Sequence, residues 1–522
     1  MSWKRLGSCR FHARGSSLEL WYCSQAKKKY IMDNNVGSII SLLLYLFYLG
    51  LALYFIYDLI FKKHNPSKSL AWIVVMLLLP YVGLIIYIYV GRDFRKNKMY
   101  SRKGLHDERL KRELSALQVE QLNQAQENLP ADIASHKKLV FLALNNSRSI
   151  LTVHNSTRLY YTGKEALEAM YESAGKARHH IHLQSFIIEN DSVGTRWKNL
   201  LCRKAMEGVD VCVIYDDFGS WYLPKSFIKE IRTAGVHIEP FGKVGFPGLR
   251  AMINYRNHRK LLIVDGEEGY LGGVNIADRY YDGGSSLEWR DTQIRIRGEA
   301  VKQLESSFLM DWYFITHKNL RRRRYYSYQL PYLEEDTVPE TCYMQIVSSG
   351  PDSDWADIMQ LYLTTITEAR KCISITTPYF IPNESILNAL RTAALGGVEV
   401  RIMLPQESDA RFVHYASLSY VTELLDAGVK VYMYTKGFIH SKTISIDGTC
   451  CVIGSANLDN RSLEHHFEVG AIIYNPAVSI EVEDQFDRYL NDSRLIIRKA
   501  WDKRPFRHKV FEQLTRLLSP LL

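Results

Sequence analysis

Two stretches of the sequence share one pattern at matched spacing, and they decide the fold. The first is His258-Arg-Lys260-Leu-Leu-Ile-Val-Asp265 followed by Gly272-Gly-Val-Asn275, and the second is His440-Ser-Lys442-Thr-Ile-Ser-Ile-Asp447 followed by Gly454-Ser-Ala-Asn457. In both copies Lys, Asp, Gly and Asn stand 2, 7, 14 and 17 residues after the His. One copy alone is weak evidence, because such residues are common on surface strands. Agreement at five positions in two copies indicates a functional motif.

The segments that precede the two motifs also match each other. Short β-branched runs begin near His180, Gly208 and Ala234 in the first copy, and near Cys372, Gly397 and Ala427 in the second. Helical segments separate these runs, which is the pattern of an α/β protein. The sequence therefore predicts two pseudo-symmetric, mixed-sheet α/β repeats, over residues 137–330 and 331–522.

The motif suits chemistry on a phosphodiester. Side chains two apart in a strand share a face, so each His should project beside its Lys. If the repeats pack about a pseudo-two-fold axis, two imidazoles, two ammonium groups and two amides converge. Lys260, Lys442, Asn275 and Asn457 are then the predicted phosphate-binding residues. The imidazoles would lie on opposite faces for in-line displacement.

The aspartates of the motif are expected to have a different role. Asp265 and Asp447 stand at an odd offset from the His, so on a continuous strand they face away from the His/Lys side. We expect them to be structural and to fix the following turn through backbone hydrogen bonds.

The composition limits the possible partners and cofactors. The chain has 522 residues, enough for two or three domains, and a formal net charge of +10. This charge favours a polyanionic partner, either nucleic acid or anionic lipid. The eight cysteines show no CxxC pair and no zinc-like spacing, and no carboxylate cluster suggests a divalent ion. No metal, disulfide or cofactor is predicted.

Two long apolar runs near the N-terminus predict a membrane protein. Val36–Tyr57 and Ala71–Val90 are 22 and 20 residues without a charge. Each is long enough to cross about 30 Å of hydrocarbon as a helix, although buried core helices are the alternative. We predict a hairpin of two transmembrane helices, about 36–60 and 70–90, within residues 36–91. Residues 1–35 form an N-terminal extension, and Met32 is a second candidate start.

The distribution of basic residues predicts the orientation of this hairpin. Lys and Arg are more numerous before the first run and after the second than in the loop between them. The positive-inside rule therefore places both ends, and everything after residue 91, in the cytoplasm. Residues 92–136 are predicted to be a charged helical connector.

The C-terminal tail from Trp501 mixes basic and apolar residues. Lys503, Arg504 and Arg507 alternate with Phe506, Phe511 and Leu514. This pattern is typical of an amphipathic helix at a membrane interface, and a helix packed on the core is the alternative.

The duplicated motif resembles that of the phospholipase D superfamily, and the chain from about Val36 onward resembles bacterial cardiolipin synthases. Further matching segments are Tyr215-Asp-Asp-Phe-Gly-Ser220, Trp289-Arg-Asp-Thr292, Thr377-Pro-Tyr-Phe-Ile-Pro382 and Phe467-Glu-Val469. The resemblance implies that two phosphatidylglycerol molecules become cardiolipin and glycerol through a phosphohistidine, without a metal, at the cytoplasmic membrane. Ser455, where the first repeat has Gly273, is a small-for-small departure.

The resemblance also implies roles for single residues. The family signature counts His258, Lys260, Asp265, His440, Lys442 and Asp447 as catalytic. His258 is the implied nucleophile and His440 the implied acid and base, although the residues alone do not distinguish the two. Asp291 and Glu468 resemble the family's orienting carboxylates.

Three other functions are compatible with the same motif. A nuclease of the superfamily would fit the positive charge but has no use for a membrane hairpin, so nucleic acid is not the predicted partner. A hydrolytic phospholipase D, or a phosphatidyltransferase with another acceptor, would use the same chemistry. A scaffold without activity would be expected to have lost a signature residue, and none is lost. The sequence does not predict the oligomeric state.

Overall fold

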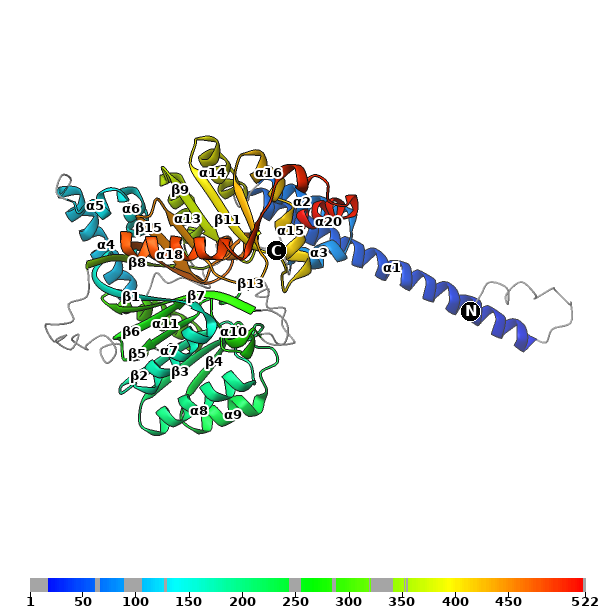
Figure 1. Ribbon diagram of the computed structural model, residues 1–522. Coiled ribbons are helices and arrows are strands. Elements are labelled where there is room, and N and C mark those ends of the chain that lie inside the picture. The colour runs from blue at the N-terminus through cyan, green and yellow to red at the C-terminus, as the bar shows by residue number, and fades with distance from the viewer. Residues whose placement is uncertain are drawn as a thin grey trace. The chain divides into compact units, whose positions relative to one another are not determined.

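The computed structural model describes residues 17–61, 66–88, 106–125, 129–243, 255–283, 288–318, 320, 341–351, 353 and 355–519. They belong to two compact units, Met1–Arg92 and Asp93–Leu522. The first unit is helical and the second is an α/β structure (Figure 1).

One sheet runs through the whole second unit. Its first half holds β1 (Thr152–Thr162), β2 (His180–Ser185), β3 (Asp210–Asp216), β4 (His237–Phe241), β5 (Leu261–Val264), β6 (Glu268–Gly272) and β7 (Glu288–Gly298). Its second half holds β8 (Thr341–Ser349), β9 (Cys372–Thr376), β11 (Glu399–Pro405), β12 (Lys430–Tyr434), β14 (Thr443–Ile446), β15 (Cys450–Gly454), β17 (Glu468–Tyr474) and β18 (Ser493–Leu495). The halves meet where β1 pairs with β8.

The strand order is the same in both halves. Outward from the junction it is β1-β7-β6-β5-β2-β3-β4 on one side and β8-β17-β15-β14-β9-β11-β12 on the other, with β18 added at the second edge. The inner pairs are antiparallel, whereas β2-β3-β4 and β9-β11-β12 are parallel. This order confirms the predicted mixed α/β duplication.

Helices cover the sheet in corresponding places. The first half has α7 (Gly163–Gly175), α8 (Ser192–Met206), α9 (Lys225–Thr233), α10 (Asp278–Asp282) and α11 (Val301–Thr316). The second has α13 (Asp357–Glu368), α14 (Glu384–Leu395), α15 (Arg411–Leu418), α16 (Val421–Asp426), α17 (Asn460–Glu464) and α18 (Pro476–Leu490). One buried cluster joins Ile294 and Leu304 of the first half to Val469 and Val482 of the second. The two repeats therefore share a core.

The described part of the predicted connector, residues 106–125 and 129–136, is mostly helical and packs on the rest of the second unit. Its helices are α4 (His106–Gln124) and α5 (Ala131–Ala134), and α6 (Lys137–Asn145) follows. The side chain of Gln118 bonds both backbone groups of Leu151, at 2.8 and 2.9 Å. Leu139 and Val140 of α6 are buried with Ile358 of the second repeat, because α6 has an apolar face. Residues 137–145, expected to begin the first repeat, thus pack in the core of the second.

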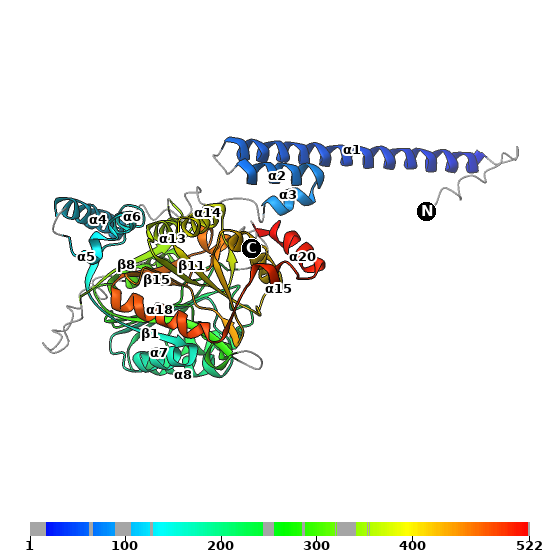
Figure 2. The same ribbon diagram turned by 45° about the horizontal axis from the view of Figure 1, so that its top comes forward.

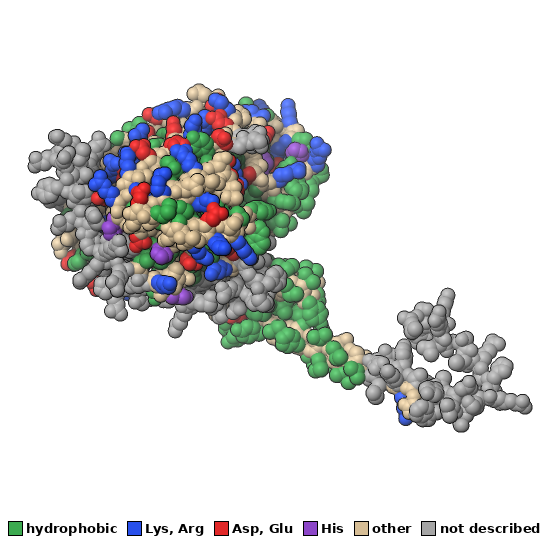
Figure 3. All heavy atoms as spheres, turned by 90° about the horizontal axis from the view of Figure 1, so that it is seen from below, with side chains coloured by type: hydrophobic (Ala, Val, Ile, Leu, Met, Phe, Trp, Pro, Cys, Tyr) green, Lys and Arg blue, Asp and Glu red, His purple; other side chains and the backbone are tan. Residues whose placement is uncertain are grey.

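The first unit contains α1 (Ser17–Phe61). Within it, Val36–Phe61 is 26 residues long with a mean hydropathy of 2.4, and it is the single helix among the described residues that is long and apolar enough to cross a membrane. Hydrophobic side chains cover most of the described surface of this unit (Figure 3). A single apolar helix suited to membrane association is therefore present.

The predicted second span, 70–90, is not formed as one helix. The segment contains α2 (Pro66–Leu78) and α3 (Val82–Ile86), which a break at Leu79–Tyr81 separates. Pro80 lacks an N–H and its ring clashes with the preceding turn, so it ends α2. At 1.5 Å per residue α2 is about 20 Å long, shorter than the hydrocarbon core.

The C-terminal tail packs on the second repeat and also leaves apolar side chains exposed. Helix α20 (Phe506–Arg516) follows α19 (Arg498–Trp501) and packs on α15, with the rings of Phe511 and Tyr415 4.7 Å apart. Glu512 is buried in an ion pair with Arg504 at 2.6 Å. The opposite side leaves an apolar stripe exposed, made of Phe506, Val510, Leu514 and Leu517.

Candidate active site

The two His-x-Lys segments lie just before β5 and β14 and not within strands. The backbone N–H of His258 donates to the carbonyl of Phe467 at 2.9 Å, and that of His440 donates to the carbonyl of Arg290 at 2.6 Å. Phe467 immediately precedes β17, and Arg290 lies in β7, so each segment bonds the other repeat. This cross-pairing explains why the segments leave their own strands, and it brings the two motifs together.

Each Lys is bonded to the backbone of its own His, although the two do not share the face of a strand as expected, because both His-x-Lys segments lie outside the strands. Lys260 Nζ donates to the carbonyl of His258 at 2.6 Å, and Lys442 Nζ donates to that of His440. Both lysines are buried. Each ammonium group is therefore held at the backbone of its own His.

The predicted orienting carboxylates are exchanged between the repeats. His440 Nδ1 lies 2.6 Å from Oδ2 of Asp291, which belongs to the first repeat. His258 Nδ1 lies 3.2 Å from Oε1 of Glu468, which belongs to the second. Both carboxylates are fully buried. A carboxylate that is hydrogen-bonded to Nδ1 holds the tautomer whose Nε2 is free to attack or to take a proton, which is the arrangement at His440. The His258 contact is within ion-pair distance, but neither His258 Nδ1 nor Glu468 Oε1 makes a hydrogen bond among the described residues.

The two half-sites differ in the residue that packs against each carboxylate. A Cβ on Gly273 would lie 2.1 Å from Oδ1 of Asp291, so a side chain has no room there. At the matching position Ser455 donates its hydroxyl to Oε2 of Glu468 at 2.5 Å. The departure between the two motif copies therefore changes how the second carboxylate is held.

The two asparagines follow β6 and β15 and are buried. Asn275 Oδ1 accepts hydrogen bonds from the Ile187 N–H at 3.1 Å and the Ser185 hydroxyl at 3.3 Å. Among the described residues, Asn457 Oδ1 has no hydrogen-bond partner. The amide of Asn275 is thus anchored to the loop after β2.

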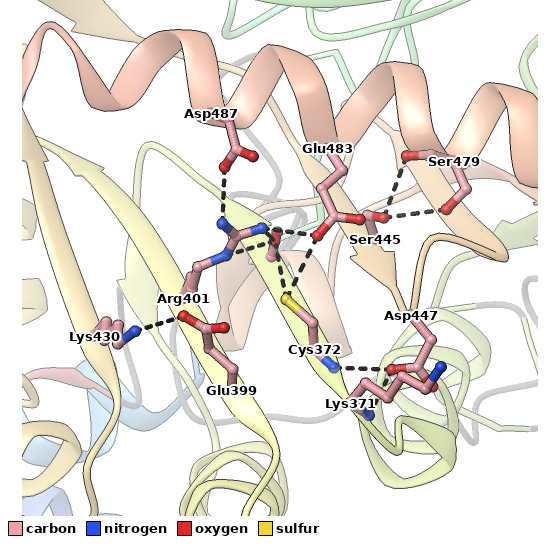
Figure 4. A network of polar contacts seen from close by, with 11 residues as sticks. Lys371, Cys372, Glu399, Arg401, Lys430, Ser445, Asp447, Ser479, Glu483 and Asp487 are labelled. Atoms are coloured by element: carbon pink, nitrogen blue, oxygen red, sulfur yellow. Dashed lines mark hydrogen bonds and ion pairs between the residues drawn. The ribbon is translucent and has the colours of Figure 1, made fainter.

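The motif aspartates lie at the far ends of β5 and β14. Both have positive φ, 56° for Asp265 and 55° for Asp447. The Asp447 carboxylate accepts the backbone N–H of Arg370 at 2.8 Å and, as Figure 4 shows, those of Lys371 and Cys372 at 2.7 and 2.9 Å. Asp265 does the same for residues 178–180 at 2.8 Å. They hold the starts of β9 and β2, instead of the following turn that we expected.

Replacing Asp265 or Asp447 with alanine is expected to lower stability and spare the chemistry. Each change removes three charge-assisted hydrogen bonds and puts a poor residue at positive φ, so a loss of about 2–4 kcal/mol in the free energy of unfolding is expected. Asparagine tolerates this φ and should recover part of the loss. Thermal unfolding and turnover per folded molecule measure the two effects. Abolished turnover with unchanged stability would contradict the structural role.

Burial sets the charge states at the site. It lowers the pKa of Lys442 to about 7 and that of Lys260 to about 8, although Asp291 and Glu468 respectively oppose the shift. Burial, together with Lys442, also lowers the pKa of His440 to about 4, against the effect of Asp291. The pKa of His258 is well below its usual value, chiefly through burial and then through both lysines. At neutral pH the site holds neutral imidazoles beside lysines near their titration points.

Several residues of the site have no role predicted from the sequence. Arg259 is buried between the repeats, where its Nε donates to the Glu468 carbonyl at 3.1 Å. The ring of His258 lies 4.3 Å from that of Phe186 and 4.6 Å from that of His466, and Trp289 lies 5.3 Å from His440. Trp289 and His466 each stand two residues before a carboxylate, a signal that could have identified them.

Two groups of described residues could offer three ligands to a metal ion. One is His258, His466 and Glu468, and the other is His180, His182 and Glu305. The first group overlaps the site itself and lies near Lys260, whose charge opposes a cation there. The second is fully buried between β2 and α11, where Glu305 already bonds both histidines.

Two half-sites of this kind in a duplicated mixed sheet define a phospholipase D-like protein. A family model described as "Cardiolipin synthase, PLD-like domain" matches residues 170–312 and 362–490, and one described as "Phospholipase D-nuclease N-terminal" matches residues 50–92. The chain is 40% identical to a cardiolipin synthase of Geobacillus sp. (strain WCH70) over 88% of this chain and 90% of that protein. The chain belongs to the cardiolipin synthase family.

Two further comparisons give a second relative and a solved structure of similar fold. A cardiolipin synthase of Alkalihalophilus pseudofirmus is 39% identical, again over 88% of this chain and 90% of that protein. The crystal structure of a phosphatidylserine synthase from Haemophilus influenzae has a TM-score of 0.56 and 13% identity, and covers 74% of this chain and 100% of that one. This second likeness supports the fold alone.

Proposed function

We propose that the chain transfers a phosphatidyl group from one phosphatidylglycerol to another, giving cardiolipin and glycerol. The observation that carries this proposal is the exchanged pairing of His440 with Asp291 and of His258 with Glu468. This pairing supports a site in which two imidazoles and two lysines act together, which suits displacement at phosphorus. The family assignment selects the lipid substrate.

In the first step, His258 Nε2 attacks the phosphorus of one lipid and the bond to the glycerol oxygen breaks. His440 donates the proton that the glycerol takes with it. Binding of the anionic phosphodiester raises the pKa of His440 from its value near 4, because an added negative charge favours imidazolium. Lys260 and Lys442 stabilise the phosphorus oxygens.

In the second step, His440 removes a proton from a headgroup hydroxyl of the second lipid. That oxygen attacks the phosphorus, the P–N bond to His258 breaks and cardiolipin forms. The lysines supply the positive charge at phosphorus, so we propose that no metal takes part.

Labelled phosphatidylglycerol tests this function when it is given to the full chain in membranes with a chelator present. Cardiolipin and glycerol in equal amounts are the expected products. Phosphatidic acid would instead show that water is the acceptor, and loss of activity to the chelator would contradict the metal-free scheme. DNA cleavage without lipid turnover would identify a nuclease.

The lysines predict a pH dependence. Their ammonium forms bind the phosphate, and their pKa values of about 7 and about 8 mean that the charge is lost as the pH rises through this range. We therefore expect kcat/KM to fall between pH 7 and 9. In Lys442→Arg the guanidinium stays charged, so the fall should move to higher pH. A profile that is flat over this range, or identical in the variant, would contradict the prediction.

We further propose that α1 anchors the chain in the cytoplasmic membrane, with the catalytic unit in the cytoplasm. The apolar stripe on α20 supports a second contact with the bilayer. Replacing Leu514 and Leu517 with Gln should raise KM several-fold for phosphatidylglycerol in vesicles but not for a short-chain, monomeric analogue. Equal effects on both substrates would show a structural role only.

A further inference from the structure

The break between α2 and α3 reverses the direction of the chain. Tyr81 has a φ of 65°, in the left-handed region. The Val82 N–H donates to the Pro80 carbonyl at 2.8 Å, and the Gly83 N–H donates to that of Leu79 at 2.7 Å. These short-range bonds close a turn at this point.

Gly83 shows that α3 folds back on α2. A Cβ on Gly83 would lie 2.4 Å from the carbonyl oxygen of Val75 and 3.1 Å from the Cα of Met76. In a continuous helix, residues 75 and 83 would be about 12 Å apart along the axis. A kink in a straight span does not bring them together, whereas a reversal does (Figure 2).

The turn is completed by a side chain from α1. Pro80 has no N–H to give to the carbonyl of Met76, the acceptor four residues earlier. Tyr48 Oη donates to this carbonyl at 2.6 Å, and the rings of Tyr48 and Tyr81 are 4.8 Å apart. An unpaired carbonyl is costly in hydrocarbon, so this bond allows irregular backbone at membrane depth.

The same segment is apolar on the side that faces away from α1. Met76, Leu84 and Tyr87 are buried in a cluster with α1. More than half of each of the following side chains is exposed: Leu70, Leu77, Leu78, Val82 and Ile85. Helix α2 is about 20 Å long, too short to cross the hydrocarbon core.

We propose that α2 and α3 form a re-entrant hairpin, which enters the bilayer from one side and returns to that side. Only α1 then crosses the membrane. In this topology the basic residues that flank the hairpin, Lys62, Lys63, Arg92 and Arg95, share the side of the catalytic unit, and the basic residues before Val36 are on the other side. The positive-inside rule therefore favours the first placement and opposes the second, and the proposal rests on the geometry of the turn. Residues before Val36 lie on the side opposite to the catalytic unit, unlike in a two-span hairpin.

Protease accessibility in the full chain tests this topology. One cleavage sequence is inserted between Asn65 and Pro66, another between Lys103 and Gly104, and a third ahead of Met1, each in a separate chain. We expect the first two to be cut only in inverted vesicles and the third only in spheroplasts. Cutting of the first two from opposite sides of the membrane would overturn the proposal.

A double variant tests whether Pro80 and Gly83 cause the chain to reverse between α2 and α3. In Pro80→Ala with Gly83→Leu, α2 can continue as a helix of about 37 Å up to residue 90, and the fold-back is blocked by the new side chain. We expect the cleavage sites at 65 and 103 to move to opposite sides. Gly50→Leu is the matched control, since a Cβ there meets nothing within 4 Å, and it should keep the original pattern. An unchanged cleavage pattern in the double variant would show that Pro80 and Gly83 do not cause the reversal.

Discussion

Replacing either His258 or His440 with alanine is expected to lower cardiolipin synthesis by about 10⁴-fold or more, because nucleophile and acid/base act as one unit. Turnover of phosphatidylglycerol in membranes measures the loss. His154→Ala, a change of an exposed histidine on β1, is the control and should retain full activity. Substantial turnover in either active-site variant would contradict the two-histidine scheme.

A substrate with an activated leaving group distinguishes the nucleophilic histidine from the acid/base histidine. A phosphatidyl ester of p-nitrophenol has a leaving group that needs no proton. His440→Ala should therefore release one equivalent of nitrophenol in a burst and then stall, whereas His258→Ala should release none. The reverse pattern would assign the nucleophile to His440.

The second large effect is expected for the carboxylates. Asp291→Asn and Glu468→Gln should each reduce synthesis by about 10²–10⁴-fold, since a neutral amide no longer fixes the imidazole tautomer or stabilises its cation. The loss should be larger for Asp291, whose contact with His440 is 2.6 Å, than for Glu468, whose contact with His258 is 3.2 Å.

The exchange between repeats gives these variants a distinctive pattern. With the nitrophenyl ester, Asp291→Asn should behave like the loss of His440 and keep the burst, and Glu468→Gln should behave like the loss of His258 and lose it. Pairing within each repeat would give the opposite result. Glu305→Gln alters a buried carboxylate that contacts two other histidines, so it should lower stability and leave the burst unchanged.

Much of this arrangement could be predicted from the spacing within each repeat. The matched offsets predicted the duplication. They also led us to expect each Lys on the same strand face as its His, whereas both segments lie outside the strands and each Lys bonds the backbone of its His. The offsets could not predict that His258 contacts Glu468, since this contact depends on how the Asn257 segment bridges to Phe467 across the repeats. The apolar face of α6 likewise does not determine which repeat the helix packs against, because that depends on tertiary contacts.

In the membrane segment, the structure differs from the helix that the sequence predicts. Length and hydropathy favour a second span over residues 70–90. The structure has a turn there because Tyr48 satisfies the carbonyl that Pro80 leaves unpaired. That partner lies 28 residues away in the chain, so no local pattern reveals it.

Trapping the covalent intermediate tests the central claim most directly. Membranes holding the full chain are mixed with phosphatidylglycerol labelled at phosphorus and quenched in denaturant within one turnover. We predict one acid-labile, base-stable label per chain on the peptide that contains His258, and none in His258→Ala. Label on a serine, a threonine or a carboxylate, or no label during active synthesis, would contradict a phosphohistidine formed between the two repeats.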